Sequence, residues 1–214
     1  MAESLAEFFL EHFSAHASEC AYKQKRGYRM VSFTYGDVLR LAQAFARDLD
    51  RRGIAKGDRL MLWGENSAEW VAAFFACTLR GVVVVPMDDG ASADFAARVF
   101  RQVHAKLLIS SRQHVGDAVQ LSPAISLEDL RSLPESRHEP LPRIGASRED
   151  TLQIVFTSGT TAEPRGVVIS HGNVLSNIAP LEREMQAGTQ LALTRLRSYI
   201  PSGLDFLQPA TACS

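Results

Sequence analysis

Short apolar runs alternate with helical segments along much of the chain, and this alternation limits the fold more than any other feature. Residues 59–63, 81–86 and 107–109 have the apolar character of buried strands. The intervening segments, 67–80 and 94–104, are predicted to be helices, and the apolar run at 70–76 suits a buried helix. Strands joined by helices form right-handed βαβ crossovers. The sequence therefore predicts an α/β fold with a largely parallel sheet and flanking helices.

The segment before residue 59 contributes further helices. Residues 5–17 have apolar side chains at helical spacing, and residues 28–33 alternate as a strand does. Thr34 is a suitable helix N-cap, and Asp37 lies three residues later, as in a capping box. The predicted helix after Thr34 ends at Gly53.

The segment after residue 148 predicts two more strands and a helix. Proline-rich residues 133–148 mark an exposed connection. Strands follow at 152–156 and 166–170, separated by a polar loop, and a helix is predicted from about His171 towards Met185. We divide the chain into an N-terminal α/β region at 1–148, a strand–turn–strand unit with its helix at 149–186, and an atypical tail at 187–214.

Composition argues against several classes of function. The 214 residues carry a formal net charge of −1, and no cluster of Lys and Arg stands out, which argues against nucleic acid as a partner. The longest apolar stretch, residues 70–87, is interrupted by Arg80 and Gly81, so we predict no transmembrane segment. The three cysteines are scattered, as in a reduced protein inside the cell. The N-terminus has neither the basic start nor the apolar run of a secretory signal, and both features favour a cytoplasmic protein.

The loop between the last two predicted strands carries the features of a phosphate site. Gly159 allows a sharp turn whose backbone N–H groups can bind an anion. Arg165 adds a charge suited to phosphate oxygens. Four hydroxyl side chains accompany them, namely Thr157, Ser158, Thr160 and Thr161. Composition alone favours a simple polar turn, and the loop is not a Walker A motif.

The order of residues in this loop resembles a known family signature. The phosphate loop of the AMP-forming adenylating enzymes has the pattern Thr-Ser-Gly-Ser/Thr-Thr-Gly-x-Pro-Lys-Gly-Val, and this chain departs from it at Ala162 and Arg165. The version with Ala162, Glu163 and Pro164 resembles long-chain fatty-acid–CoA ligases. The matching residues are Thr157, Ser158, Gly159, Thr160, Thr161, Pro164, Gly166 and Val167. Segments 32–35, 57–59, 65–70, 81–86 and 170–174 also resemble the family.

The resemblance implies an ATP-dependent acid–thiol ligase. In that family a carboxylate attacks the α-phosphorus of ATP, pyrophosphate leaves, and the thiol of coenzyme A then takes the acyl group. The resemblance implies ATP, Mg²⁺ and coenzyme A as cofactors and a carboxylic acid, favoured as a fatty acid, as substrate. It assigns nucleotide contacts to Thr157, Ser158, Gly159, Thr160, Thr161, Glu163, Arg165 and Gly166.

The family also uses segments that we do not find in this sequence, including those that bind adenine and ribose and a C-terminal catalytic lysine. We therefore assign no catalytic residue and expect the chain alone to be incomplete and inactive, with contacts to a missing C-terminal portion. A frameshift near residues 186–196 is our hypothesis for the atypical tail. The alternatives are a non-catalytic nucleotide-binding or interaction module and a truncated gene product that folds poorly.

Weaker groupings favour structural roles. His12, His16 and Cys20 lie four residues apart, but the helix is expected to end before Cys20 and no fourth ligand follows. Asp88 and Asp89 precede a glycine and favour a turn. His171, at a helix start, is expected to be structural. We assign no metal ligand.

Overall fold

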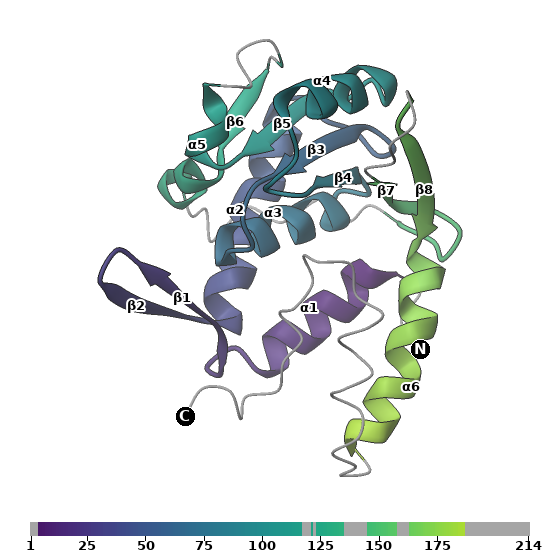
Figure 1. Cartoon of the computed structure of the whole chain (residues 1–214). Coiled ribbons are helices and arrows are strands. Elements are labelled where there is room, and N and C mark those ends of the chain that lie inside the picture. Colours follow the sequence, from purple (N-terminus) through teal and green to yellow (C-terminus); the bar gives the residue numbers. More distant parts are fainter. Residues whose placement is uncertain (1–3, 117–120, 122, 135–144, 158–162, 187–214) are drawn as a thin grey trace.

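The computed structural model of the chain describes residues 4–116, 121, 123–134, 145–157 and 163–186. Its centre is a six-stranded sheet in the order β6-β5-β3-β4-β7-β8 (Figure 1). All neighbouring strands are parallel except β7 and β8, which are antiparallel. The predicted α/β fold with a largely parallel sheet is confirmed. The strands are β3 (Arg59–Trp63), β4 (Val83–Met87), β5 (Leu107–Ser110), β6 (Ala124–Ser126), β7 (Thr151–Thr157) and β8 (Arg165–Ser170).

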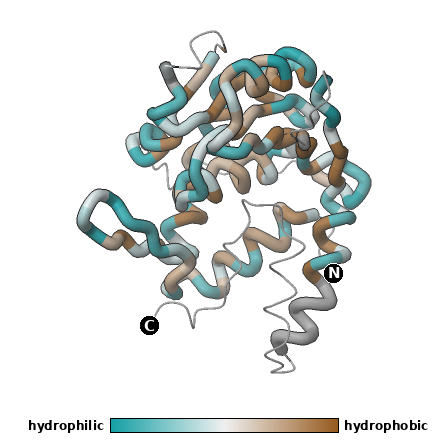
Figure 2. Tube along the Cα trace, viewed as in Figure 1, coloured by the Kyte–Doolittle hydropathy of each residue, from teal (hydrophilic) through white to brown (hydrophobic). Residues whose placement is uncertain are grey.

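Helices cover both faces of the sheet. One face packs on α1 (Leu5–Ala15), α2 (Tyr35–Arg51) and α3 (Ala68–Leu79), and the other packs on α4 (Ala93–Gln102). Alternate residues of one strand serve the two cores: Leu60 and Leu62 lie in the first, whereas Met61 and Trp63 lie in the second. Figure 2 shows apolar residues concentrated in these layers.

Hydroxyl caps fix where several helices begin. The Thr34 side chain accepts a hydrogen bond from the backbone N–H of Asp37, whose carboxylate accepts one from the Thr34 N–H. This reciprocal pair confirms the predicted capping box of α2. Ser67 and Ser92 cap α3 and α4 in the simpler one-way form.

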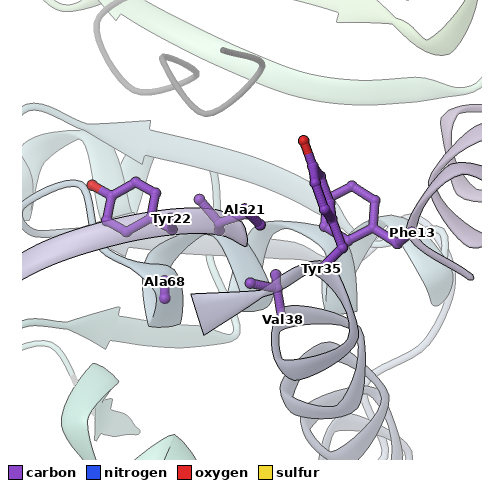
Figure 3. Close-up of a pocket in the computed structure, with 7 residues that line it drawn as sticks. Phe13, Ala21, Tyr22, Tyr35, Val38 and Ala68 are labelled. Atoms are coloured by element: carbon purple, nitrogen blue, oxygen red, sulfur yellow. The ribbon is translucent and has the colours of Figure 1, made fainter. Parts of the chain in front are cut away.

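A two-stranded hairpin lies outside the main sheet. It consists of β1 (Cys20–Arg26) and β2 (Arg29–Thr34), paired antiparallel. The sequence predicted only the second strand, because Lys23 to Arg26 has no apolar alternation. Ala21 and Tyr22, near the start of β1, border a small apolar cavity of about 10 Å³ beside α2 (Figure 3), too small to hold more than one water.

Three short elements also escaped sequence prediction. They are α5 (Arg112–Val115), the strand β6 and the 3₁₀ helix η1 (Leu127–Ser132). None is long enough to show a repeating apolar pattern. The predicted regions 1–148 and 149–186 share one sheet, because β7 pairs with β4. The last helix, α6, spans His171–Gln186, and the predicted tail at 187–214 lies outside the described residues.

Candidate nucleotide phosphate site

The β7–β8 hairpin holds the two ends of the predicted phosphate loop. Its register places Thr157 opposite Arg165 and Phe156 opposite Gly166. The loop therefore leaves the sheet at Thr157 and re-enters it at Arg165, and the backbones of these two residues are paired. Ser158, Gly159, Thr160 and Thr161, the centre of the predicted site, lie outside the described residues.

The described part of the loop is open to solvent. Glu163, Arg165 and Gly166 are all exposed. The structure thus gathers Thr157, Glu163, Arg165 and Gly166 at one end of an antiparallel hairpin, and it leaves the Arg165 side chain accessible to a ligand. The site assignment of all eight residues stays a prediction.

Gly166 is required by close packing. A Cβ added there would lie 2.8 Å from Cζ of Phe156 and 2.9 Å from Cγ2 of Ile154. Both distances are shorter than ordinary contacts, so any larger residue would displace the strand or the ring. The glycine of the signature therefore lets β8 lie against the β7 side chains that precede the loop.

Buried and ionic contacts fix the base of the hairpin. His171, at the start of α6, is 1% exposed, and its Nδ1 accepts a hydrogen bond from the Leu5 backbone N–H at 3.1 Å. Burial lowers the pKa of His171. Lys56 forms a salt bridge with Asp150 at 2.8 Å, and its hydrogen bond to that carboxylate is the main reason that the pKa of Asp150 is lowered. The predicted structural role of His171 is confirmed.

A cavity of about 290 Å³ lies beside the hairpin. The Gln102 side chain, at the end of α4, donates a hydrogen bond to the Pro164 carbonyl at 3.3 Å, which ties α4 to the loop's exit. Sequence reasoning missed Gln102, because no local pattern brings residues 62 positions apart together. The cavity lining contains two basic side chains and no carboxylate: Arg59, Gln102, Val103, His104, Ile154, Phe156 and Gly166.

The weaker groupings have structural roles in the described part of the chain. Asp88 accepts a hydrogen bond from the Gly90 backbone N–H at 2.8 Å, which confirms the predicted turn. The His16 ring bonds the His12 carbonyl at 2.9 Å. Within the described ranges no three His, Cys, Asp or Glu side chains are grouped to hold a metal ion. Burial raises the pKa of the Cys77 thiol, which makes it a poor nucleophile.

Edge strand β8 exposes apolar surface on both of its faces. Val167 and Val168 are 56% and 61% exposed, although neighbouring residues of a strand point to opposite faces. In the described residues, no helix combines the length and the apolar character needed to cross a membrane.

Comparison with known proteins agrees with this arrangement. The family model described as AMP-binding enzyme matches residues 11–207. Long-chain-fatty-acid–CoA ligase FadD13 of Mycobacterium tuberculosis (strain CDC 1551 / Oshkosh) is 32% identical over 156 residues, covering 68% of this chain and 31% of that protein. Malformin synthetase mlfA of Aspergillus tubingensis (strain CBS 134.48) is 28% identical over 174 residues, covering 80% of this chain and 3% of that protein.

A solved structure extends the likeness to the fold. The inhibitor-bound N-terminal domain of FACL13 from Mycobacterium tuberculosis superposes with a TM-score of 0.68 at 26% identity, covering 79% of this chain and 45% of that one. The chain spans between 3% and 34% of the length of the curated relatives that it matches. The fold, the hairpin register and the extent of the family match together assign the chain to the AMP-binding enzyme family.

Proposed function

We propose that residues 157–166 bind the polyphosphate of ATP, in the N-terminal part of a ligase that activates a carboxylic acid as an acyl-adenylate for transfer to coenzyme A. The observation that carries the proposal is the hairpin register, which sets the exposed Arg165 opposite Thr157 at the mouth of the loop. Family membership supports the class of reaction.

The chemistry of this loop is electrostatic. Arg165 donates hydrogen bonds to phosphate oxygens, and charge-assisted bonds of this kind are stronger than neutral ones. The backbone N–H groups and hydroxyls of residues 157–161 offer further donors. Donors placed in advance around developing negative charge lower the barrier for phosphoryl chemistry. ATP, when bound, supplies the adenylyl group.

The described residues of the loop support binding of ATP, but they do not form a metal site. The exposed face at Glu163, Arg165 and Gly166 leaves room for a polyphosphate. The described part of the chain has no group of carboxylates that would hold Mg²⁺ by itself, and Mg²⁺ bound with nucleotides often keeps several waters and phosphate ligands. We therefore assign no residue to magnesium.

A fatty acid is our proposed substrate class. The Ala162-Glu163-Pro164 segment resembles long-chain fatty-acid ligases, and one relative carries that name. Another relative is named a malformin synthetase, so family membership by itself does not fix the acid. Competition between fatty acids and amino acids for binding in the presence of ATP tests this choice.

The test of nucleotide binding is a calorimetric titration of the chain with ATP and with pyrophosphate. Arg165→Gln is expected to weaken both affinities about tenfold, which is about 1.4 kcal/mol. Arg29→Gln, an exposed arginine on the separate β1–β2 hairpin, is the matched control and is expected to leave both unchanged. Equal affinities for the original chain and Arg165→Gln would refute the role of this loop.

A hydroxamate-trapping assay with ATP and fatty acids separates binding from turnover. We propose that residues 1–214 bind nucleotide but do not ligate by themselves, and robust hydroxamate formation would contradict this. Nucleotide binding that no carboxylic acid changes would favour a non-catalytic nucleotide-binding module instead.

A further inference from the structure

The β1–β2 hairpin projects from the body of the molecule, and no other labelled element lies beside its turn (Figure 1). Its two-residue turn, Gly27-Tyr28, has a positive φ of 57° at the glycine, as a tight hairpin turn with glycine in first place requires. Tyr28 is fully exposed, and Met30 is 64% exposed. Two large apolar side chains thus stand in solvent at the most protruding part of the hairpin.

Contacts on one face hold the hairpin firmly to the body. The Tyr22 hydroxyl donates a hydrogen bond to the Asn66 carbonyl at 2.8 Å. Gln24 accepts one from the Ala68 backbone N–H at 2.9 Å. Arg26 forms an ion pair with Glu69, which is 2% exposed. Because these contacts fix the strand positions, the opposite face and the tip are presented in a defined orientation.

Arg131 of η1 strengthens this attachment. It pairs with the same Glu69 carboxylate, and both arginines lie over the Phe33 ring, Arg26 at 5.8 Å and Arg131 at 4.8 Å from its centroid. The Arg26 side chain is therefore bound to groups of the protein itself. Lys25 and Arg29, both exposed, are the hairpin cations that we consider for a partner.

The hairpin carries positive charge without compensating acids of its own. Residues 20–34 contain Lys23, Lys25, Arg26 and Arg29 but no Asp or Glu. The strand register places Lys25 opposite Met30, so a cation and an apolar side chain share the outward face. Arg29 is exposed beside Tyr28. Figure 2 shows this largely hydrophilic hairpin with its few apolar positions.

This combination suits the interface of an anionic bilayer. Tyrosine is favoured at the headgroup level of membranes, and lysine and arginine are attracted to anionic headgroups. A stable protein interface needs roughly 800 Å² from each partner, more than a convex two-residue tip offers. We propose that the β1–β2 tip docks the chain on an anionic lipid surface, with Tyr28 and Met30 at the headgroup level and Lys25 and Arg29 on the lipid phosphates.

Vesicle co-sedimentation tests the charge requirement. The chain is expected to bind vesicles that contain phosphatidylglycerol, to bind pure phosphatidylcholine weakly, and to dissociate as salt is raised. Lys25→Glu combined with Arg29→Glu is expected to reduce binding about tenfold or more, given the contribution of each cation near an anionic surface. The matched control reverses two exposed cations far from the hairpin, Arg59→Glu with Arg101→Glu, and is expected to retain most of the binding.

Fluorescence tests the position of the tip independently. Both tryptophans of the chain, Trp63 and Trp70, are buried, so Tyr28→Trp adds an exposed reporter. Its emission is expected to shift to the blue with anionic vesicles and to be quenched by brominated lipids. Binding without such a shift, equal loss in the control variant, or binding to soluble heparin but not to vesicles would each overturn the proposal.

Discussion

Gly166 shows how one residue limits the geometry of the loop. Its replacement by alanine would place a methyl group within 2.9 Å of two side chains of β7. We expect Gly166→Ala to lower the free energy of unfolding by about 1 kcal/mol, because the Phe156 ring must move aside. Urea denaturation measures the loss. Replacing the ring by Phe156→Leu should reduce the cost of Gly166→Ala without abolishing it, because Cγ2 of Ile154 would still lie 2.9 Å from the added methyl group. An equal cost in both backgrounds would show that the Phe156 ring is not a source of the strain.

His171 gives stability a pH dependence of predictable sign. Burial lowers its pKa in the folded state, so the unfolded chain takes up a proton first as the pH falls. The free energy of unfolding is therefore expected to decrease below about pH 6.5, the ordinary pKa of histidine, and to level off below the lowered pKa. Urea denaturation across this range is the measurement.

The control for His171 is His171→Asn, whose side-chain oxygen can still accept the Leu5 N–H but cannot titrate. The variant is expected to be less stable at neutral pH, with a shallower pH dependence in the same window. An unchanged dependence would assign the titration to other groups.

At the scale of elements, the N-terminal cap of α2 contributes locally to stability. The sequence predicted it from Thr34 and Asp37 alone. The Thr34 hydroxyl accepts the Asp37 N–H at 3.1 Å and donates to the Asp37 carboxylate at 2.8 Å. Thr34→Ala is expected to cost about 1 kcal/mol in thermal or urea unfolding, whereas Thr34→Ser keeps the hydroxyl and most of the stability. Equal losses for both variants would mean that the methyl group, and not the cap, matters.

The elements that sequence reasoning found have strong periodicity or clear caps. Strands β3, β4 and β5 were predicted from continuous apolar runs, α2 from its cap and apolar stripe, and α3 from the apolar run that follows Ser67. Strand β1 was missed because its stability comes from tertiary contacts, such as the Gln24 side chain on the start of α3. Its residues have no pattern that distinguishes a strand from a polar loop.

At the scale of the whole molecule, the order of strands and the contacts between distant segments could not be predicted from the sequence. Strand β3 lies between β4 and β5, so α3 and α4 fall on opposite faces of the sheet. The bond from Gln102 to Pro164 and that from Leu5 to His171 follow from this order, and both support the loop hairpin. The two strands that flank the predicted loop, β7 and β8, were predictable because their apolar runs are local. The contacts around them depend on the order of the strands.

The most direct test of the phosphate-loop assignment is a titration of the isotope-labelled chain with pyrophosphate, followed by backbone amide NMR. Chemical-shift changes that saturate and concentrate in residues 157–166, and that weaken in Arg165→Gln, are the predicted result. Shifts absent from these amides while pyrophosphate binds elsewhere, or no saturable binding at all, would contradict the account.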